Sequence, residues 1–187
     1  MDFLEYKAKA QETRIYPEEY KVIYPMLKLL GELGELKLAR TIEDKIKELG
    51  DVFWYIAAIC SDLEIEENYN LKTKKETELS SDSNMLDIAF ERYISIGLDN
   101  ACKASESLGK ILRDGKVRKE ISGESKITED TDNMFEILEH HLRALANNMA
   151  CCCEALKVSA SFVFEVNLQK LQSRKERGVL KGSGDNR

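Results

Sequence analysis

The stretch "LGELGELKLARTIEDKIKELGDVFW" (residues 30–54) decides how this chain folds. It is typical of two consecutive helices, and each helix carries a pair of carboxylates separated by two residues. Glu32 and Glu35 form the first pair, and Glu48 and Asp51 form the second. A spacing of three places both members of a pair on one helix face. Leucines and aromatic residues surround both pairs, so the acids lie within or beside the faces that turn inward.

Apolar residues recur at helical spacing on both sides of this stretch. They predict a helix with apolar positions from 22 to 36, and further helices over 41–63, 85–113, 132–158 and 162–177. Pro25 predicts a kink or a late start in the first helix. Thr41 is a candidate N-cap of the second, with Asp44 as its partner three residues on. We find no convincing strand. Amphipathic helices without strands can bury their apolar stripes only on each other, so an all-α helical bundle is expected.

Composition narrows the class of protein further. The chain has 187 residues, of which 33% are charged and 43% hydrophobic, which is typical of a globular protein. The net charge of −6 argues against a nucleic-acid partner. No apolar run approaches the roughly 20 residues that span a bilayer, and the N-terminus has no apolar signal core. We therefore expect a cytoplasmic protein without a membrane partner.

The cysteines and histidines do not form a recognisable metal motif. The five cysteines lack a Cys-x-x-Cys pair, and three of them are consecutive within "ACCCEAL". We interpret them as small buried hydrophobic residues of a reducing compartment. The pair His140–His141 has no cysteine at ligand spacing, so a solvated helix face is the expectation there.

Four acids beside a core need compensation, because an unpaired buried carboxylate costs several kcal/mol or more. Lys37 and Lys47 project about 100° from their acidic neighbours, and the sequence offers no obvious cationic partner. A hard divalent ion such as Mg²⁺ or Mn²⁺ is a natural solution. Gly34 and Gly50, one inside each pair, suggest close approach of two helices. The alternative is a solvated charged face, since Glu64/Glu67 and Glu136/Glu139 match the same short pattern.

The combined pattern resembles a known family. "GELGEL" followed by "ELGDVFWYIA" is similar to the signature of MazG-like all-α nucleoside triphosphate pyrophosphohydrolases, which is Glu-x-x-Glu, a gap, and Glu-x-x-Asp. "RIYPEEY" and "NLQKLQSRKERGVLKGSGDNR" also look like segments of small phage and bacterial members. The resemblance implies hydrolysis of a (d)NTP to the monophosphate and pyrophosphate, with Mg²⁺ or Mn²⁺ as cofactor. It implies metal-binding and catalytic roles for Glu32, Glu35, Glu48 and Asp51. If the chain is phage-encoded, the reaction takes place in the host cytoplasm.

The substrate contacts are expected on the last helix and the tail. One face of the last helix carries Asn167, Lys170, Arg174 and Arg177. The Gly-rich tail over 178–187 adds Lys181 and Arg187, and we hypothesise that it closes over the bound triphosphate as a lid. Trp54, Tyr16 and Tyr20 are aromatic candidates for the base, although residues at such spacing are more often core. The base cannot be read from the sequence, and a purine nucleotide such as dGTP is a first substrate to try. The alternatives are a dUTPase/dCTPase-type all-α hydrolase and a non-catalytic helical interaction protein.

The chain departs from the small members of that family in its long middle. Residues 72–166 separate the second acidic helix from the last helix. Within them, "LRALANNMACCCEAL" aligns with "IKELGDVFWYIAAIC", which puts Ala144 and Asn147 at the two acidic positions. "GLDNACKASESLGKILRDGK" looks like the first metal helix, with Glu106 alone remaining.

The expected organisation is therefore a fused pseudo-duplication. A metal-binding repeat over 1–70 is followed by a linker over 71–84, a degenerate repeat over 85–177 and the tail. An unrelated helical insertion is the alternative. Exposed apolar faces suggest that two chains associate as a C₂ homodimer.

Overall fold

The computed structural model describes residues 1–65, 69, 71, 83–114 and 129–180, and this part of the chain is all-α, as predicted. Its elements, in chain order, are α1 (Phe3–Ala10), two short 3₁₀ turns (Gln11–Thr13 and Glu18–Tyr20), α2 (Ile23–Leu38), α3 (Ile42–Asp62), α4 (Ser83–Arg113), α6 (Glu129–Ala155) and α7 (Ala160–Glu176). The described residues contain no strand. None of the described helices combines the length and the apolar character needed to cross a membrane.

Local signals explain where three of the helices begin. The Thr41 hydroxyl accepts a hydrogen bond from the Asp44 amide at 3.1 Å, which confirms Thr41 as the N-cap of α3. Pro25 is the third residue of α2, so the late start is the correct alternative. Helix α1 was not predicted from the sequence, although Asp2 and Glu5 form a capping box there. A box of this kind is a readable signal, but α1 has only eight residues.

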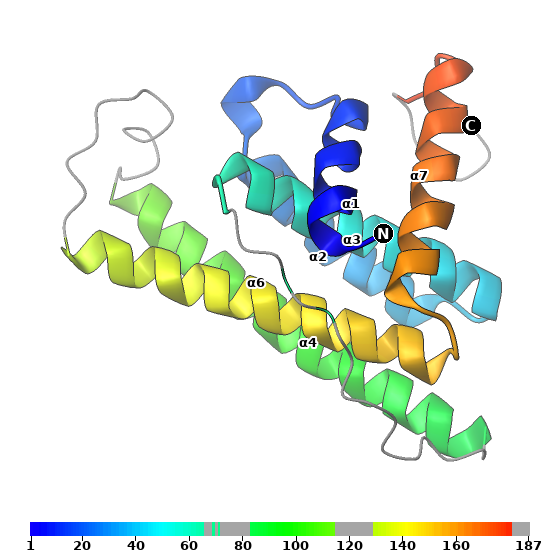
Figure 1. Cartoon of the computed structure of the whole chain (residues 1–187). Coiled ribbons are helices and arrows are strands. Elements are labelled where there is room, and N and C mark those ends of the chain that lie inside the picture. The colour runs from blue at the N-terminus through cyan, green and yellow to red at the C-terminus, as the bar shows by residue number, and fades with distance from the viewer. Residues whose placement is uncertain (66–68, 70, 72–82, 115–128, 181–187) are drawn as a thin grey trace.

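Two helical hairpins make up most of the molecule (Figure 1). In the first, a short turn over residues 39–41 joins α2 to α3. In the second, α4 and α6 run antiparallel, so that Asn100 meets His141 and Phe90 meets Cys152. Helices α1 and α7 pack against α3 and cover its outer side. This arrangement places α3 at the centre of the fold.

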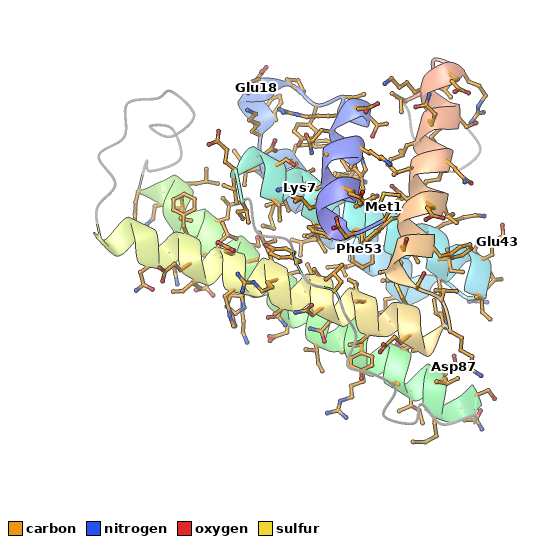
Figure 2. The ribbon with its side chains drawn as sticks, viewed as in Figure 1. Met1, Lys7, Glu18, Glu43, Phe53 and Asp87 are labelled. Atoms are coloured by element: carbon orange, nitrogen blue, oxygen red, sulfur yellow. The ribbon has the colours of Figure 1, made fainter. Side chains whose placement is uncertain are left out.

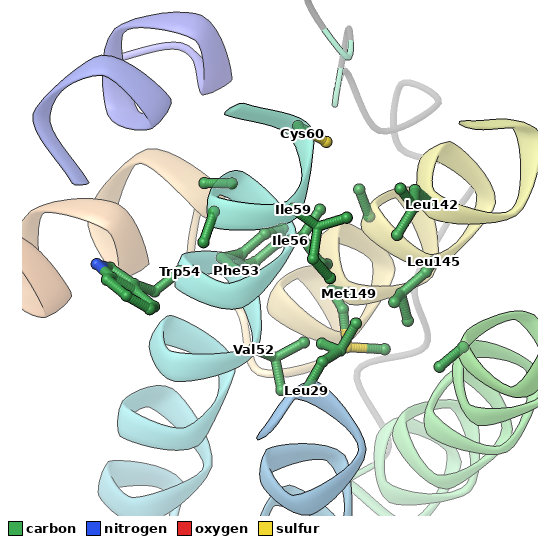
Figure 3. Packing of buried hydrophobic residues seen from close by; sticks show 14 of the residues in the cluster. Leu29, Val52, Phe53, Trp54, Ile56, Ile59, Cys60, Leu142, Leu145 and Met149 are labelled. Atoms are coloured by element: carbon green, nitrogen blue, oxygen red, sulfur yellow. The ribbon is translucent and has the colours of Figure 1, made fainter. Parts of the chain in front are cut away.

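One hydrophobic core serves both hairpins (Figure 3). Figure 3 shows Ile59 of α3 beside a group of α6 side chains, with Val52 of α3 and Leu29 of α2 near Met149 of that group. The α6 side chains of that group are Leu142, Leu145 and Met149, and all are buried. The repeats expected over 1–70 and 85–177 therefore share a core. Descent of the second hairpin from a duplication stays a prediction.

The N-terminal segment ties distant parts of the chain together (Figure 2). The Met1 amino group donates to the Ser161 hydroxyl at the start of α7, at 2.9 Å. Lys7 donates to the carbonyl of Ile65, just beyond α3. Tyr69 is buried and its ring stacks on Phe3, with 5.2 Å between centroids. Tyr69 precedes the linker expected over 71–84, and its ring is part of the core.

The cysteine prediction is confirmed for three residues and wrong for two. Cys60, Cys152 and Cys153 are buried, whereas Cys102 is exposed and Cys151 is half-buried. His140 is exposed, as expected of a solvated face. His141 is half-buried, and its Nδ1 lies 3.0 Å from the Asn100 side-chain oxygen, so it belongs to the contact between α4 and α6.

Candidate metal centre

Three of the four predicted acids come together between α2 and α3. Glu32 of α2 and Glu48 and Asp51 of α3 each offer a carboxylate oxygen, and these oxygens lie within 4.8 Å of one another. Glu32 and Glu48 are buried, and Asp51 is half-buried. The antiparallel hairpin creates the cluster, because the inward edge of α2 faces the Glu48–Asp51 edge of α3. We call these three residues the acid cluster.

Glu35, the fourth predicted ligand, is exposed and lies outside the acid cluster. Three residues of an α-helix advance about 300°, so Glu35 is turned about 60° from Glu32. That rotation is enough to move a side chain from the inward edge of α2 to the rim. Its charge still acts on the cluster, since it contributes to raising the pKa of Glu32. Glu35 is therefore near the site, but the described geometry does not make it a ligand.

The electrostatics of Glu32 show the strain of gathering these acids. Burial raises the pKa of the Glu32 carboxyl above its usual value, and the nearby charge of Asp51 raises it further. Lys28, one turn earlier on α2, opposes this effect. Its Nζ lies 3.0 Å from a Glu32 oxygen. Without a further cation beside Lys28, burial and the repulsion from Asp51 both destabilise the ionised form of Glu32 in the folded protein.

A second cation at the acid cluster comes from α7 and pairs with Asp51. The Lys170 ammonium donates to both Asp51 carboxylate oxygens, at 2.7 and 2.6 Å. The prediction that the chain supplies no cationic partner was therefore wrong. Lys28 is a neighbour at helical spacing that a closer reading would have found. Lys170 lies 119 residues from Asp51, and only the packing of α7 on α3 joins them.

Hydrogen bonds from Tyr6 through Asn167 support the Asp51 carboxylate, and we call this chain of three residues the amide relay. Asn167, almost fully buried on α7, donates its side-chain N–H to Asp51 at 2.9 Å. The Tyr6 hydroxyl of α1 donates to the Asn167 side-chain oxygen at 2.8 Å. A carboxylate can only accept, so the amide nitrogen must face Asp51 and its oxygen must face Tyr6. Asp51 thereby fixes the orientation of the Asn167 amide, and Tyr6 supports it by donating to the amide oxygen. No sequence motif indicated this role of Tyr6.

Gly50 allows this approach of α7. A Cβ atom at Gly50 would lie 2.8 Å from Asn167 Cβ and 3.0 Å from its amide nitrogen. The prediction of close helix approach is confirmed at Gly50, although the neighbour is α7 rather than α2. At Gly34 it was wrong, because no described atom lies within 4 Å of a Cβ placed there.

The other residues predicted to contact phosphate lie towards the C-terminal end of α7 and in the tail that follows it. Arg174 is buried on α7, and Arg177 is exposed and donates to the Ser173 carbonyl. Lys181, Arg187 and the tail from residue 181 lie outside the described residues. Of the predicted α7 residues, Asn167 and Lys170 are the ones for which a contact with the acid cluster is established.

Aromatic side chains border the acid cluster along the same hairpin. Trp54 is buried and donates its indole N–H to Thr13 at 3.0 Å, so little of its surface is offered to a ligand. Tyr24 and Tyr55 face each other one turn beyond Lys28 and Asp51, with ring centroids 6.5 Å apart. Burial raises the pKa of the Tyr55 hydroxyl, and nearby Tyr24 and the acids raise it further. Neither tyrosine was among the aromatic candidates for the base that were predicted from the sequence.

The α4–α6 hairpin, which was aligned with the metal-binding repeat, has no second acid cluster among its described residues. Glu106 is exposed and paired with Lys110, and Asn147 is exposed on α6. Among the described residues, the acid cluster is the one group of three or more carboxylate, histidine or cysteine side chains that could hold a metal ion. The fold and site thus define an all-α protein with one carboxylate cluster between two helices of its central hairpin.

Comparison with known proteins places the chain in a phage family. It is 39% identical over 96 residues to the Gene 37 protein of Mycobacterium phage L5, a match that covers 51% of this chain and 75% of that protein. The chain therefore belongs to the family of that phage protein, whose name specifies no activity. No protein-family model matches the chain, and no solved structure matches it.

Proposed function

We propose that this protein is a nucleoside triphosphate pyrophosphohydrolase of the MazG-like type, dependent on Mg²⁺ or Mn²⁺. The observation that carries the proposal is the acid cluster, with carboxylate oxygens of two helices within 4.8 Å of one another. Such an all-oxygen donor set suits a hard divalent cation. The raised pKa of Glu32 supports the fit, because a cation would offset both of its causes.

Glu32, Glu48 and Asp51 would hold the ion. When bound, the ion supplies neutralisation of the triphosphate charge and activation of a water molecule. In the reaction, a water oxygen bonds to the α-phosphorus, the bond from that phosphorus to the bridging oxygen breaks, and pyrophosphate leaves. The attacking water gives up one proton to the solvent, and the products are the (d)NMP and pyrophosphate.

Lys170 is placed to neutralise Asp51 in the free protein and to contact a phosphate oxygen when the nucleotide is bound. In the free protein its ammonium neutralises Asp51, as the two short contacts show. Its long, flexible side chain can exchange that carboxylate for a phosphate oxygen. Asn167, held by Tyr6, retains its contact with Asp51 during such an exchange. We therefore expect Lys170→Met to raise KM for the nucleotide.

A substrate panel tests the proposal directly. The eight canonical NTPs and dNTPs, together with dUTP, are each assayed with Mg²⁺ and with Mn²⁺ by released pyrophosphate, and dGTP is the first purine deoxynucleotide to try. Turnover confined to dUTP or dCTP would favour the dUTPase/dCTPase-type alternative. A ligand at one hundred times its Kd stabilises a protein by about 2.7 kcal/mol. No turnover and no thermal stabilisation by ion plus nucleotide would favour a non-catalytic helical interaction protein.

Glu48→Gln is the informative variant, and Glu136→Gln on α6 is its matched control. Both replace a glutamate of a Glu-x-x-Glu or Glu-x-x-Asp pattern, but Glu136 is exposed and outside the acid cluster. Glu48→Gln should abolish turnover with the helical circular dichroism unchanged, and the control should keep full activity. Asp51→Asn is less clean, because it also removes the partner of Lys170.

A further inference from the structure

Helix α2 has an apolar face on the side away from the core. Its inward face carries the buried residues Leu29, Leu33 and Leu36. A surface helix normally presents polar residues on the opposite side. Here that side carries Ile23, Leu27, Gly31, Gly34 and Leu38. At about 100° per residue, these five positions fall within about 40° of one line along the helix.

The two leucines of this face are among the most exposed apolar side chains of the described structure. Leu27 is 66% exposed and Leu38 is 79% exposed. Between them, Gly31 and Gly34 have no described atom within 4 Å of a Cβ position. Glycine weakens a helix interior relative to alanine, and nothing described within this chain requires it there. Two open glycines between exposed leucines would let another helix backbone approach closely.

We infer that this face of α2 binds the same face of a second copy of the chain, with the two helices antiparallel. The order of residues along the face carries the inference, because it reads the same in both directions. It runs leucine, three residues, glycine, two residues, glycine, three residues, leucine. A twofold axis requires that if one residue meets another, the reverse contact also forms. Leu27 would meet the partner subunit's Leu38, and Gly31 would meet the partner subunit's Gly34.

The charges beside the stripe are compatible with the same arrangement. Lys28 and Glu35 flank it on one side, in the first and second halves of α2 respectively. Antiparallel pairing brings Lys28 towards the partner subunit's Glu35, so opposite charges meet on that flank. An unrelated partner protein would not require a stripe that is symmetric about its own centre. The same order therefore favours a second copy over a different protein.

Sedimentation equilibrium of the full chain over a wide concentration range tests the inference. The wild type should be a dimer, and Leu27→Lys or Leu38→Lys should raise the dimer dissociation constant at least tenfold. Ile88→Lys on α4 is the control, since Ile88 is also about 60% exposed but lies off the stripe. The control should leave the dissociation constant unchanged. A wild type that stays monomeric at the highest soluble concentration overturns the inference.

A double variant, Gly31→Ala with Gly34→Ala, keeps the test independent of added charge. Within one chain both alanines have open space and favour the helix. In the dimer they would hold the two backbones apart. The inference predicts a raised melting temperature at low concentration together with a raised dimer dissociation constant. A raised melting temperature with an unchanged dissociation constant overturns it. Since neither glycine belongs to the acid cluster, this outcome is separate from that of the proposed function.

Discussion

Replacement of Gly50 by alanine tests the contact that brings α7 to the acid cluster. The new methyl group would lie 2.8 Å from Asn167 Cβ, closer than real side chains come. Asn167 cannot easily move aside, because it is buried and bonded to both Tyr6 and Asp51. Relief of the overlap therefore requires α7 to shift or the amide relay to break.

The expected magnitude follows from two opposing effects. Overpacking of a well-packed interior costs about 1–3 kcal/mol. Alanine gains about 1 kcal/mol over glycine in a helix interior. Gly50→Ala should therefore lower the free energy of unfolding by about 0–2 kcal/mol. The small net value makes a control essential.

Gly109→Ala on α4 is the matched control, because no described atom lies within 4 Å of its Cβ position. It has the same gain in helix propensity and no overlap, so it should be neutral to stabilising. The difference between the two variants isolates the overlap at about 1–3 kcal/mol. Gly97→Ala should fall between them, since its closest contact is the flexible end of Met149, at 2.6 Å.

Urea unfolding followed by circular dichroism measures all three variants, with equal slopes as the sign of a common unfolding reaction. Under the proposed function, Gly50→Ala should also weaken the thermal stabilisation by Mn²⁺, and Gly109→Ala should not. Equal stability of Gly50→Ala and Gly109→Ala would refute the close packing of α7 on α3 that underlies the site.

Three further predictions concern single groups. Tyr6→Phe keeps the ring but removes the hydroxyl that donates to Asn167, so it should lower the free energy of unfolding by about 0.5–1.5 kcal/mol and weaken Mn²⁺ binding in thermal-shift titrations. The folded-state pKa of Glu32 is raised, so its ionised form opposes folding, and this cost develops as pH rises from the unfolded-state pKa through the folded-state pKa. In urea unfolding without metal, any stability gain of Glu32→Gln over the wild type should therefore be larger at pH 7 than at pH 4, and a gain that shrinks with pH would contradict this. Cys102 is exposed, whereas burial raises the pKa of the Cys60 thiol to about 12, so a thiol reagent should label Cys102 rapidly and Cys60 only on unfolding, as mass spectrometry of labelled peptides would show.

The local features of this protein are determined by its sequence. The apolar spacing around Leu29, Leu33 and Leu36 defines the inward face of α2, and Thr41 fixes where α3 begins. The spacing of three puts Glu48 and Asp51 on one face of a helix. These properties depend only on residues within a few turns of one another, so periodicity and capping chemistry suffice to predict them.

The tertiary structure decides which faces meet. It brings Glu32 to Asp51 and leaves Glu35 at the rim, although both glutamates fit the same motif. It also brings Asn167 and Lys170 to Asp51 across more than a hundred residues of chain. Helical spacing gives the direction of each side chain but not the helix that will pack against it. That choice depends on how the whole core fills, and at this site it depends on the room left by a glycine on α3.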